Sequence, residues 1–141
     1  MQKLNIAVGG SRHDKRWQNR QLTWASFVAR ISKTHRTAET VAEYAAAKKA
    51  RQDEIKDIGG FVGGYLSGGR RLATAVTSRS IITLDADSAE PDMWQSFCLM
   101  YGCAAALYST HKHTPDAPRF RLIVPLSREV LCDEYQAIAR R

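Results

Sequence analysis

Three glycine pairs stand near the middle of the chain, at positions 59–60, 63–64 and 68–69, within eleven residues. Glycine at this density permits positive φ and close approach of the backbone, so this segment predicts a tight irregular loop or a bulged hairpin. It is not a phosphate-binding P-loop, because no Gly-Lys-Ser/Thr ending follows the glycines. The pairs separate an N-terminal strand with helices, predicted within residues 1–57, from a loop and core sheet predicted within residues 58–141.

Apolar spacing predicts the elements that precede the glycines. Residues 4–8 form an apolar run that indicates a strand, and the polar, basic residues 11–21 indicate a loop. Apolar side chains at helical spacing predict a helix after Thr23, which is a suitable N-cap. A second, alanine-rich helical stretch runs over residues 37–57, with a capping box that begins at Thr40.

Strands and helices alternate after the glycines. We expect strands over residues 72–76 and 80–84 joined by residues 77–79, a helix from Pro91, strands over 104–109 and 119–126 with Pro125 near a sheet edge or strand end, and a final helix from Cys132. This order predicts an α+β fold in which a mixed or antiparallel sheet is flanked by helices. The length of 141 residues predicts one domain, residues 1–141.

Basic side chains are concentrated in the first part of the chain. Residues 1–84 carry 15 Lys and Arg against 6 Asp and Glu, a formal charge of +9, whereas residues 85–141 carry 6 against 8, a formal charge of −2. This unequal distribution predicts binding of a polyanion, most simply a nucleic acid. A solvated surface with surplus lysine and arginine is the alternative.

Composition argues against several classes of protein. The three cysteines form no C-x-x-C pair, which argues against a disulfide framework and a zinc ribbon. No apolar run reaches the roughly 18–20 residues of a membrane-spanning helix. We therefore expect a cytoplasmic protein with no membrane partner.

The apolar segment 81–84 runs directly into Asp85-Ala86-Asp87. Because side chains alternate along a strand, both carboxylates lie on one face at the strand's end. Hard oxygen ligands of this kind suit Mg²⁺ or Mn²⁺ held together with substrate phosphates. The sequence therefore predicts a divalent-metal site at Asp85 and Asp87. The alternative is a surface turn in which Asp87 or Ser88 caps the next helix.

Two further groups stand next to predicted strands. His111 and His113 follow the strand 104–109, where a histidine can contact a phosphate or carry a proton, or can simply belong to a polar loop. Arg119 and Arg121 share one face of the next strand, and the planar guanidinium binds phosphate through two hydrogen bonds. The alternative for this pair is two exposed cross-strand arginines.

Taken in order, these motifs resemble the primase–polymerase domain of the archaeo-eukaryotic primase superfamily, in the phage and prophage type that is often fused to a helicase. The family's first motif, an apolar strand that ends in Asp-x-Asp, is matched by Asp85 and Asp87. Its second motif, a small residue, any residue and then histidine, is matched by Ser109-Thr110-His111. The resemblance spans nearly the whole chain. It implies an RRM-like catalytic core and a phage- or prophage-encoded protein in the cytoplasm of a bacterial host.

The resemblance also implies a catalytic site that uses Mg²⁺ or Mn²⁺. In it, Asp85 and Asp87 bind the metal, and His111 contacts the incoming nucleotide. The residues implied to contact nucleotide phosphates are Ser109, Lys112, Arg119 and Arg121, and those implied to contact nucleic acid are Arg70, Arg71 and Arg79. The expected function is that of the N-terminal part of a DNA or RNA primase–polymerase, which transfers nucleotides from nucleoside triphosphates on a single-stranded template, with a helicase domain as partner.

One departure from the family concerns its third motif, an apolar residue followed by a carboxylate. After Arg121 the chain offers only Glu129, Asp133 and Glu134, in or beside the last predicted helix. The chain also ends within that helical segment. We therefore expect either a truncated fragment or a naturally shortened relative, inactive or weakly active by itself.

Two other functions follow from this departure. One is a non-catalytic, shortened primase-like protein that inhibits a host nuclease in the manner of an anti-CRISPR protein, through protein or nucleic-acid binding. The other is a module that docks on a helicase or replisome. An enzyme depends on Asp85 and Asp87, whereas an inhibitor depends on its basic surface.

Overall fold

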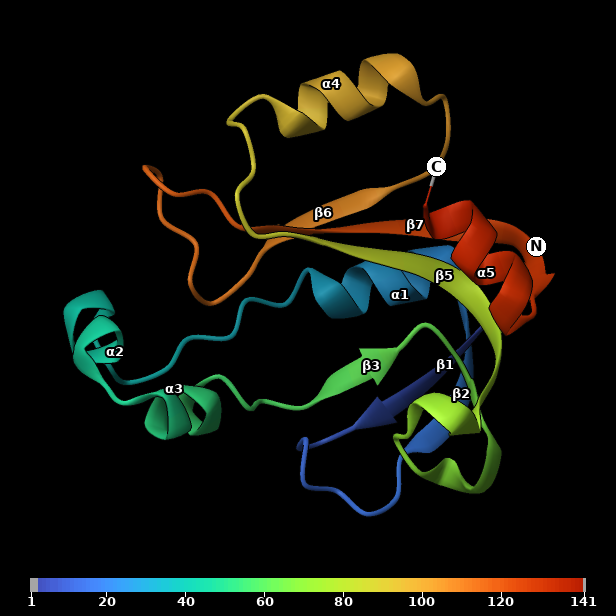
Figure 1. Cartoon of the computed structure of the whole chain (residues 1–141), viewed down its shortest axis with the longest axis horizontal. Coiled ribbons are helices and arrows are strands. Elements are labelled where there is room, and N and C mark those ends of the chain that lie inside the picture. The colour runs from blue at the N-terminus through green and yellow to red at the C-terminus, as the bar shows by residue number, and fades with distance from the viewer. Residues whose placement is uncertain (1–2, 141) are drawn as a thin grey trace.

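The computed structural model describes residues 3–140, and two antiparallel sheets with flanking helices make up this part of the chain (Figure 1). The first sheet has the strand order β2-β1-β3, with β1 (Lys3–Gly9), β2 (Gln18–Thr23) and β3 (Gly60–Val62). The second has the order β4-β5-β7-β6, with β4 (Gly64–Leu66), β5 (Val76–Ala86), β6 (Ala106–Ser109) and β7 (Phe120–Val130). The predicted α+β class with helix-flanked antiparallel strands is confirmed.

Five helices occur in the described residues, namely α1 (Trp24–Ile31), α2 (Val41–Ala46), α3 (Lys49–Ile55), α4 (Met93–Met100) and α5 (Cys132–Ala139). Two short 3-10 turns, η1 (Ser67–Gly69) and η2 (Ala73–Ala75), connect β4 to β5. None of the helices in residues 3–140 is long and apolar enough to cross a membrane.

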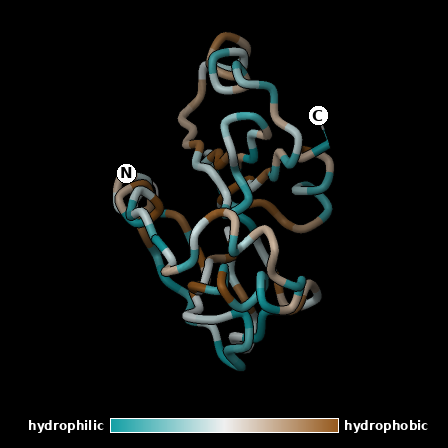
Figure 2. The backbone as a smooth tube through the Cα atoms, turned by 90° about the vertical axis from the view of Figure 1, so that its left-hand side faces the viewer, coloured by the Kyte–Doolittle hydropathy of each residue, from teal (hydrophilic) through white to brown (hydrophobic). Residues whose placement is uncertain are grey.

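The two sheets share one apolar core. Leu4, Ile6 and Val8 alternate along β1 and therefore face the same side, where they meet Ile81 of β5 and Ile123 of β7. Phe27 of α1 completes this cluster; like the two isoleucines of the second sheet, it has no exposed surface. The hydrophobic stretches of the backbone lie along these central strands and on α4 at the top of the molecule (Figure 2).

Polar contacts join the sheets beside this core. The Asn5 backbone N–H donates to Ser80 Oγ at 3.1 Å, and Ser80 is fully buried. The Asn5 side chain and the Ser78 hydroxyl both donate to Glu129 Oε1, at 2.7 and 2.9 Å. β1, β5 and β7 are thus held together by hydrogen bonds as well as by apolar packing.

The prediction of a loop over residues 11–21 is wrong at its end, because β2 begins at Gln18. β2 pairs with β1 residue by residue, from Lys3 opposite Thr23 to Val8 opposite Gln18. Its first four side chains are exposed, so the strand lacks the apolar alternation by which strands are recognised. The helix predicted after Thr23 is confirmed, and the Thr23 side chain accepts a hydrogen bond from Ser26 N at 3.1 Å.

The single helix predicted over residues 37–57 is two helices. The capping box at Thr40 is present, but Ala47 takes an extended conformation and ends α2. The Gln52 side chain of α3 donates to the Tyr44 carbonyl at 2.9 Å, which gives a partner to an acceptor at the end of α2. Tertiary contacts therefore outweigh the alanine-based helix propensity here.

The two strands predicted at 72–76 and 80–84 are one strand, β5, that begins only at Val76. Its polar residues 77–79 lie within the strand, and a register shift between Arg79 and Ile81 accommodates them opposite β7. Pro125 does not lie at a strand end, since β7 continues to Val130, but it does lie at a local edge of the sheet, which is the other position predicted for it. β6 pairs with β7 only as far as Ile123, so the proline lies where β7 has a single neighbour, and it interrupts no ladder on its other side.

Candidate functional site

Asp85 and Arg121 lie directly opposite one another in the pairing of β5 with β7. Arg121 Nε donates to Asp85 Oδ1 at 2.5 Å and Arg121 Nη2 donates to Asp85 Oδ2 at 3.1 Å. The guanidinium therefore occupies both carboxylate oxygens. The predicted metal ligand and the predicted phosphate ligand form a two-pronged ion pair with each other.

Asp87 and Arg119 form a second ion pair, through a single contact, one step beyond the strand end. Arg119 Nη1 lies 3.3 Å from Asp87 Oδ1. The Asp87 side chain is 74% exposed, against 51% for Asp85. Asp85, Asp87, Arg119 and Arg121 together form what we call the strand-end cluster, in which two negative and two positive charges balance.

Tyr108 of β6 lies on the other side of Arg121. Its hydroxyl is 3.4 Å from Arg121 Nη1, and the guanidinium carbon is 6.0 Å from the ring centroid. The hydrogen bonds from Arg121 to Asp85 raise the pKa of the guanidinium above its usual value, with a smaller contribution from Tyr108. Arg121 is therefore a permanently charged group held between an acidic and an aromatic side chain.

A groove of about 410 Å³ adjoins this ion pair. Arg71, Arg79 and Arg121 line it, together with the apolar residues Phe61 and Leu72 and with Thr83, which lies two positions before Asp85 on β5. Arg71 lies over the Trp17 ring at 5.1 Å and Arg79 over the Tyr135 ring at 4.9 Å. Within residues 3–140 no carboxylate lies within 4.0 Å of Arg71 or Arg79. The groove thus presents positive charge beside an apolar wall.

The predicted site residues at the end of β6 and just after it are only partly brought to this region. Ser109 is paired with Phe120 at the same end of the sheet, whereas His111 packs against Tyr44 of α2, with ring centroids 4.4 Å apart. None of the hydrogen bonds and ion pairs within residues 3–140 joins His111 to the strand-end cluster. Lys112 is exposed.

Of the two histidines after β6, it is His113 that contacts a residue of the strand-end cluster. Its Nδ1 accepts the backbone N–H of Arg119 at 3.1 Å, and its ring centroid lies 5.0 Å from that of Phe120. The motif of a small residue, any residue and histidine predicts a role in nucleotide binding for His111. It predicts no specific role for His113. The i, i+2 spacing of the histidines was the only signal for it.

The strand-end cluster offers oxygen ligands of the kind that Mg²⁺ and Mn²⁺ prefer. It supplies only two carboxylates, and both are paired with arginine. In the described part of the chain no group of three or more His, Cys, Asp or Glu side chains could hold a metal ion. Such a cluster fits a divalent ion only when a phosphate ligand binds the arginines in place of the carboxylates and supplies further oxygen ligands to the ion.

Sequence reasoning missed several residues of this region. Thr83, Phe61 and Leu72 line the groove, and Tyr108 contacts Arg121. The period of two places Thr83 on the face of Asp85, which is a signal that the sequence does carry, whereas the approach of Phe61 and Leu72 depends on the tertiary fold. Arg70, predicted beside Arg71, is exposed and does not line the groove.

Comparison with models of known protein families gives a match over the whole chain. The family model of the VapE N-terminal domain matches residues 1–141, which is the entire chain. The chain belongs to this family. The VapE-like family is a phage- or prophage-type, primase-related one, which agrees with the coarser part of the resemblance in the sequence. No curated protein matches the chain, and neither does any solved structure.

Proposed function

We propose that the strand-end cluster and the adjoining groove bind a nucleoside triphosphate together with Mg²⁺ or Mn²⁺, as the nucleotide site of a primase-type nucleotidyl transferase. The observation that carries this proposal is the placement of Arg71, Arg79 and Arg121 along one groove, with Arg121 also paired to Asp85. Three guanidinium groups suit a triphosphate, since each can bind phosphate oxygens through two hydrogen bonds. Phe61 and Leu72 offer an apolar surface for the base.

In this proposal, binding of the nucleotide and the metal ion changes the partners of the charged side chains in the strand-end cluster. Arg121 and Arg119 turn from the carboxylates to the phosphates, and Asp85 and Asp87 then face the divalent ion. When bound, the ion neutralises phosphate charge and favours in-line displacement at the phosphorus. Arginine holds the polyphosphate, and the half-buried position of Arg121 limits the competition from water.

Calorimetric titration of a nucleoside triphosphate tests the proposal, with and without Mn²⁺, on the 141-residue chain and on Asp85→Asn. We expect binding that needs both the metal and the nucleotide, and its loss in Asp85→Asn. Asp133→Asn is the matched control, because Asp133 is exposed at the start of α5, beyond the opposite end of β7. Equal binding by Asp85→Asn and the unaltered chain would contradict the proposal. Circular dichroism melting of each variant verifies that it is folded.

A second candidate function is a non-catalytic inhibitor of a host nuclease. It is favoured by the two-carboxylate cluster, in which each acid is already paired with arginine. This candidate predicts no metal-dependent nucleotide binding by the unaltered chain. It also predicts full inhibition by Asp85→Asn, measured as the residual cleavage rate of the inhibited nuclease.

A further inference from the structure

A second basic surface lies on the three-stranded sheet, and no motif in the sequence indicates it. A pocket of about 300 Å³ is lined by Arg16, Arg20 and Arg30, with Val8 and Ile58 as apolar lining. None of these three arginines is part of the strand-end cluster or of the groove beside it. We refer to this feature as the three-arginine pocket.

The alternation of β2 explains how the pocket forms. Gln18, Arg20 and Leu22 share a face of β2, and the register places Gln18 opposite Val8 of β1. Leu22 packs against the apolar core, while Gln18 and Arg20 line the pocket further along the same face. Arg30 comes from the last turn of α1, the helix that follows β2 directly.

The charge of the pocket is only partly offset by neighbouring side chains, since one carboxylate stands against three guanidinium groups. Within residues 3–140 no carboxylate lies within 4.0 Å of any of its three arginines. Asp14 also lines the pocket, but its Oδ2 accepts the backbone N–H groups of Gly10 and Ser11, at 2.8 and 3.1 Å. Guanidinium groups that share one pocket repel each other, and a bound anion relieves that repulsion.

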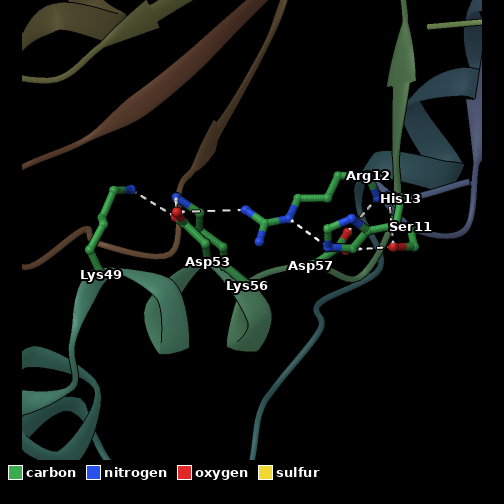
Figure 3. A network of polar contacts seen from close by, with 7 residues as sticks. All are labelled: Ser11, Arg12, His13, Lys49, Asp53, Lys56 and Asp57. Carbon is green, nitrogen blue, oxygen red and sulfur yellow. Dashed lines mark hydrogen bonds and ion pairs between the residues drawn. The ribbon is translucent and has the colours of Figure 1, made fainter.

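A cluster of cations surrounds Asp53 (Figure 3). Lys49 and Lys56 of the α3 segment and Arg12 of the β1–β2 loop all approach Asp53, with N–O distances of 2.7, 2.8 and 3.6 Å. Hydrogen bonds from the two lysines hold the pKa of Asp53 well below its usual range, so this carboxylate stays charged. Three positive charges stand against the two negative charges of Asp53 and Asp57, so the cluster keeps a net positive charge.

Asp57 fixes the position of this cluster relative to the pocket. It accepts hydrogen bonds from Ser11 Oγ at 2.6 Å and from the Arg12 backbone N–H at 2.9 Å. Gly10 and Ile58, which line the pocket, are the chain neighbours of Ser11 and Asp57. The pocket and the cation cluster are therefore adjacent, and together they place basic side chains over β2, the β1–β2 loop and α3.

We propose that this surface binds the phosphodiester backbone of a nucleic acid strand, with phosphates at the three-arginine pocket and along the Arg12–Lys49–Lys56 cluster. The positive charge extends over several elements, which suits a chain of phosphates rather than one small anion. The binding needs neither a divalent metal nor a nucleotide, so it is independent of the function proposed for the strand-end cluster. The basic residues of this surface belong to residues 1–84, where the sequence concentrates positive charge.

Fluorescence anisotropy of a labelled oligothymidylate tests this proposal in the absence of divalent ions and nucleotide. Arg20→Ala and Arg30→Ala are compared with Arg140→Ala, which removes the same charge from an exposed position after α5. We expect the first two to weaken binding and to reduce the salt dependence of log K by about 0.7 for each phosphate that the protein no longer binds. Arg140→Ala should retain the affinity and slope of the unaltered chain.

Two results would overturn the proposal. One is unchanged binding by both pocket variants, and the other is an equal weakening in all three variants, which would mean that total charge alone determines affinity. Arg20→Gln, with a melting curve for every variant, separates removal of the guanidinium from unfolding of the chain. A duplex competitor distinguishes single-stranded from duplex ligand. Arg20→Ala should bind nucleotide and Mn²⁺ as the unaltered chain does. If the unaltered chain binds no nucleotide, the anisotropy experiment still tests the binding of nucleic acid, because it contains neither nucleotide nor metal.

Discussion

At the scale of single residues, the ion pair of Asp85 with Arg121 contributes little to folding. Both side chains are about one-third to one-half exposed, at 51% and 35%. Exposed ion pairs contribute only about 0–1 kcal/mol to stability, because water screens the charges and both side chains lose freedom. The small contribution means that exchanging the carboxylate for a phosphate costs the molecule little. Such an arrangement is suited to a site that changes partners.

Glu134 provides a residue-scale prediction about pH. The Arg128 guanidinium, and then the Leu131 backbone N–H, lower the pKa of Glu134 from 4.5 to about 2. Because the folded pKa is depressed, the stabilisation is present above about pH 4.5 and is lost as the pH falls towards 2. Glu134→Gln should therefore lower the thermal midpoint at neutral pH, and the difference from the unaltered chain should vanish near pH 2. A difference that does not change with pH in melting curves would contradict this assignment. Glu90→Gln is the control.

At the scale of elements, β4 depends on a glycine that faces its neighbour. A Cβ added to Gly64 would overlap the backbone carbonyl oxygen of Ser78 across the β4–β5 pair. By contrast, a Cβ added to Gly102 has no heavy atom within 4 Å. The glycine-rich segment is thus not a loop throughout, since one of its glycines permits two strands to approach.

We predict that Gly64→Ala lowers the free energy of unfolding by about 1–3 kcal/mol, because the added methyl group forces β4 away from β5. Gly102→Ala should change it by less than about 0.5 kcal/mol. Urea unfolding followed by circular dichroism measures both. Equal free energies of unfolding for the two variants would contradict this prediction, because they would show that β4 moves away from β5 without loss of stability.

The sequence predicts elements well where one local signal decides them, and less well where a distant contact decides. The N-cap at Thr23 and the capping box at Thr40 are local, and both are present. The apolar periodicity of the sequence does not predict β2, because a strand at an exposed sheet edge requires no apolar side chains. The site follows the same rule, since alternation places Asp85 and Asp87, but only the β5–β7 register brings Arg121 to Asp85. The prediction of a single domain over residues 1–141 stays a prediction.

At the scale of the whole molecule, Phe27 links the two sheets. It is fully buried, and its ring lies 5.0 Å from Phe61 of β3 and packs in the cluster that contains Ile81 and Ile123. The sheets therefore depend on the same apolar contacts. Neither sheet keeps a complete core when the other is removed.

We expect Phe27→Ala to lower the free energy of unfolding by about 3–5 kcal/mol, as for other buried aromatic residues. Tryptophan fluorescence and circular dichroism should report a single, coincident urea transition in the unaltered chain. Leu99→Ala, at a position 88% exposed, should leave stability nearly unchanged. Two separate transitions in the unaltered chain would contradict a shared core.

The unequal charge of the two parts of the chain gives the molecule an electric dipole. The strands and helices of residues 3–75 lie together below the longer strands, while α4, α5 and β6, from the part that carries −2, lie above or beside them (Figure 1). In the field of a polyanion such a dipole experiences a torque before any contact forms. The molecule then rotates so that the β1–β2 loop and α3 lead the encounter.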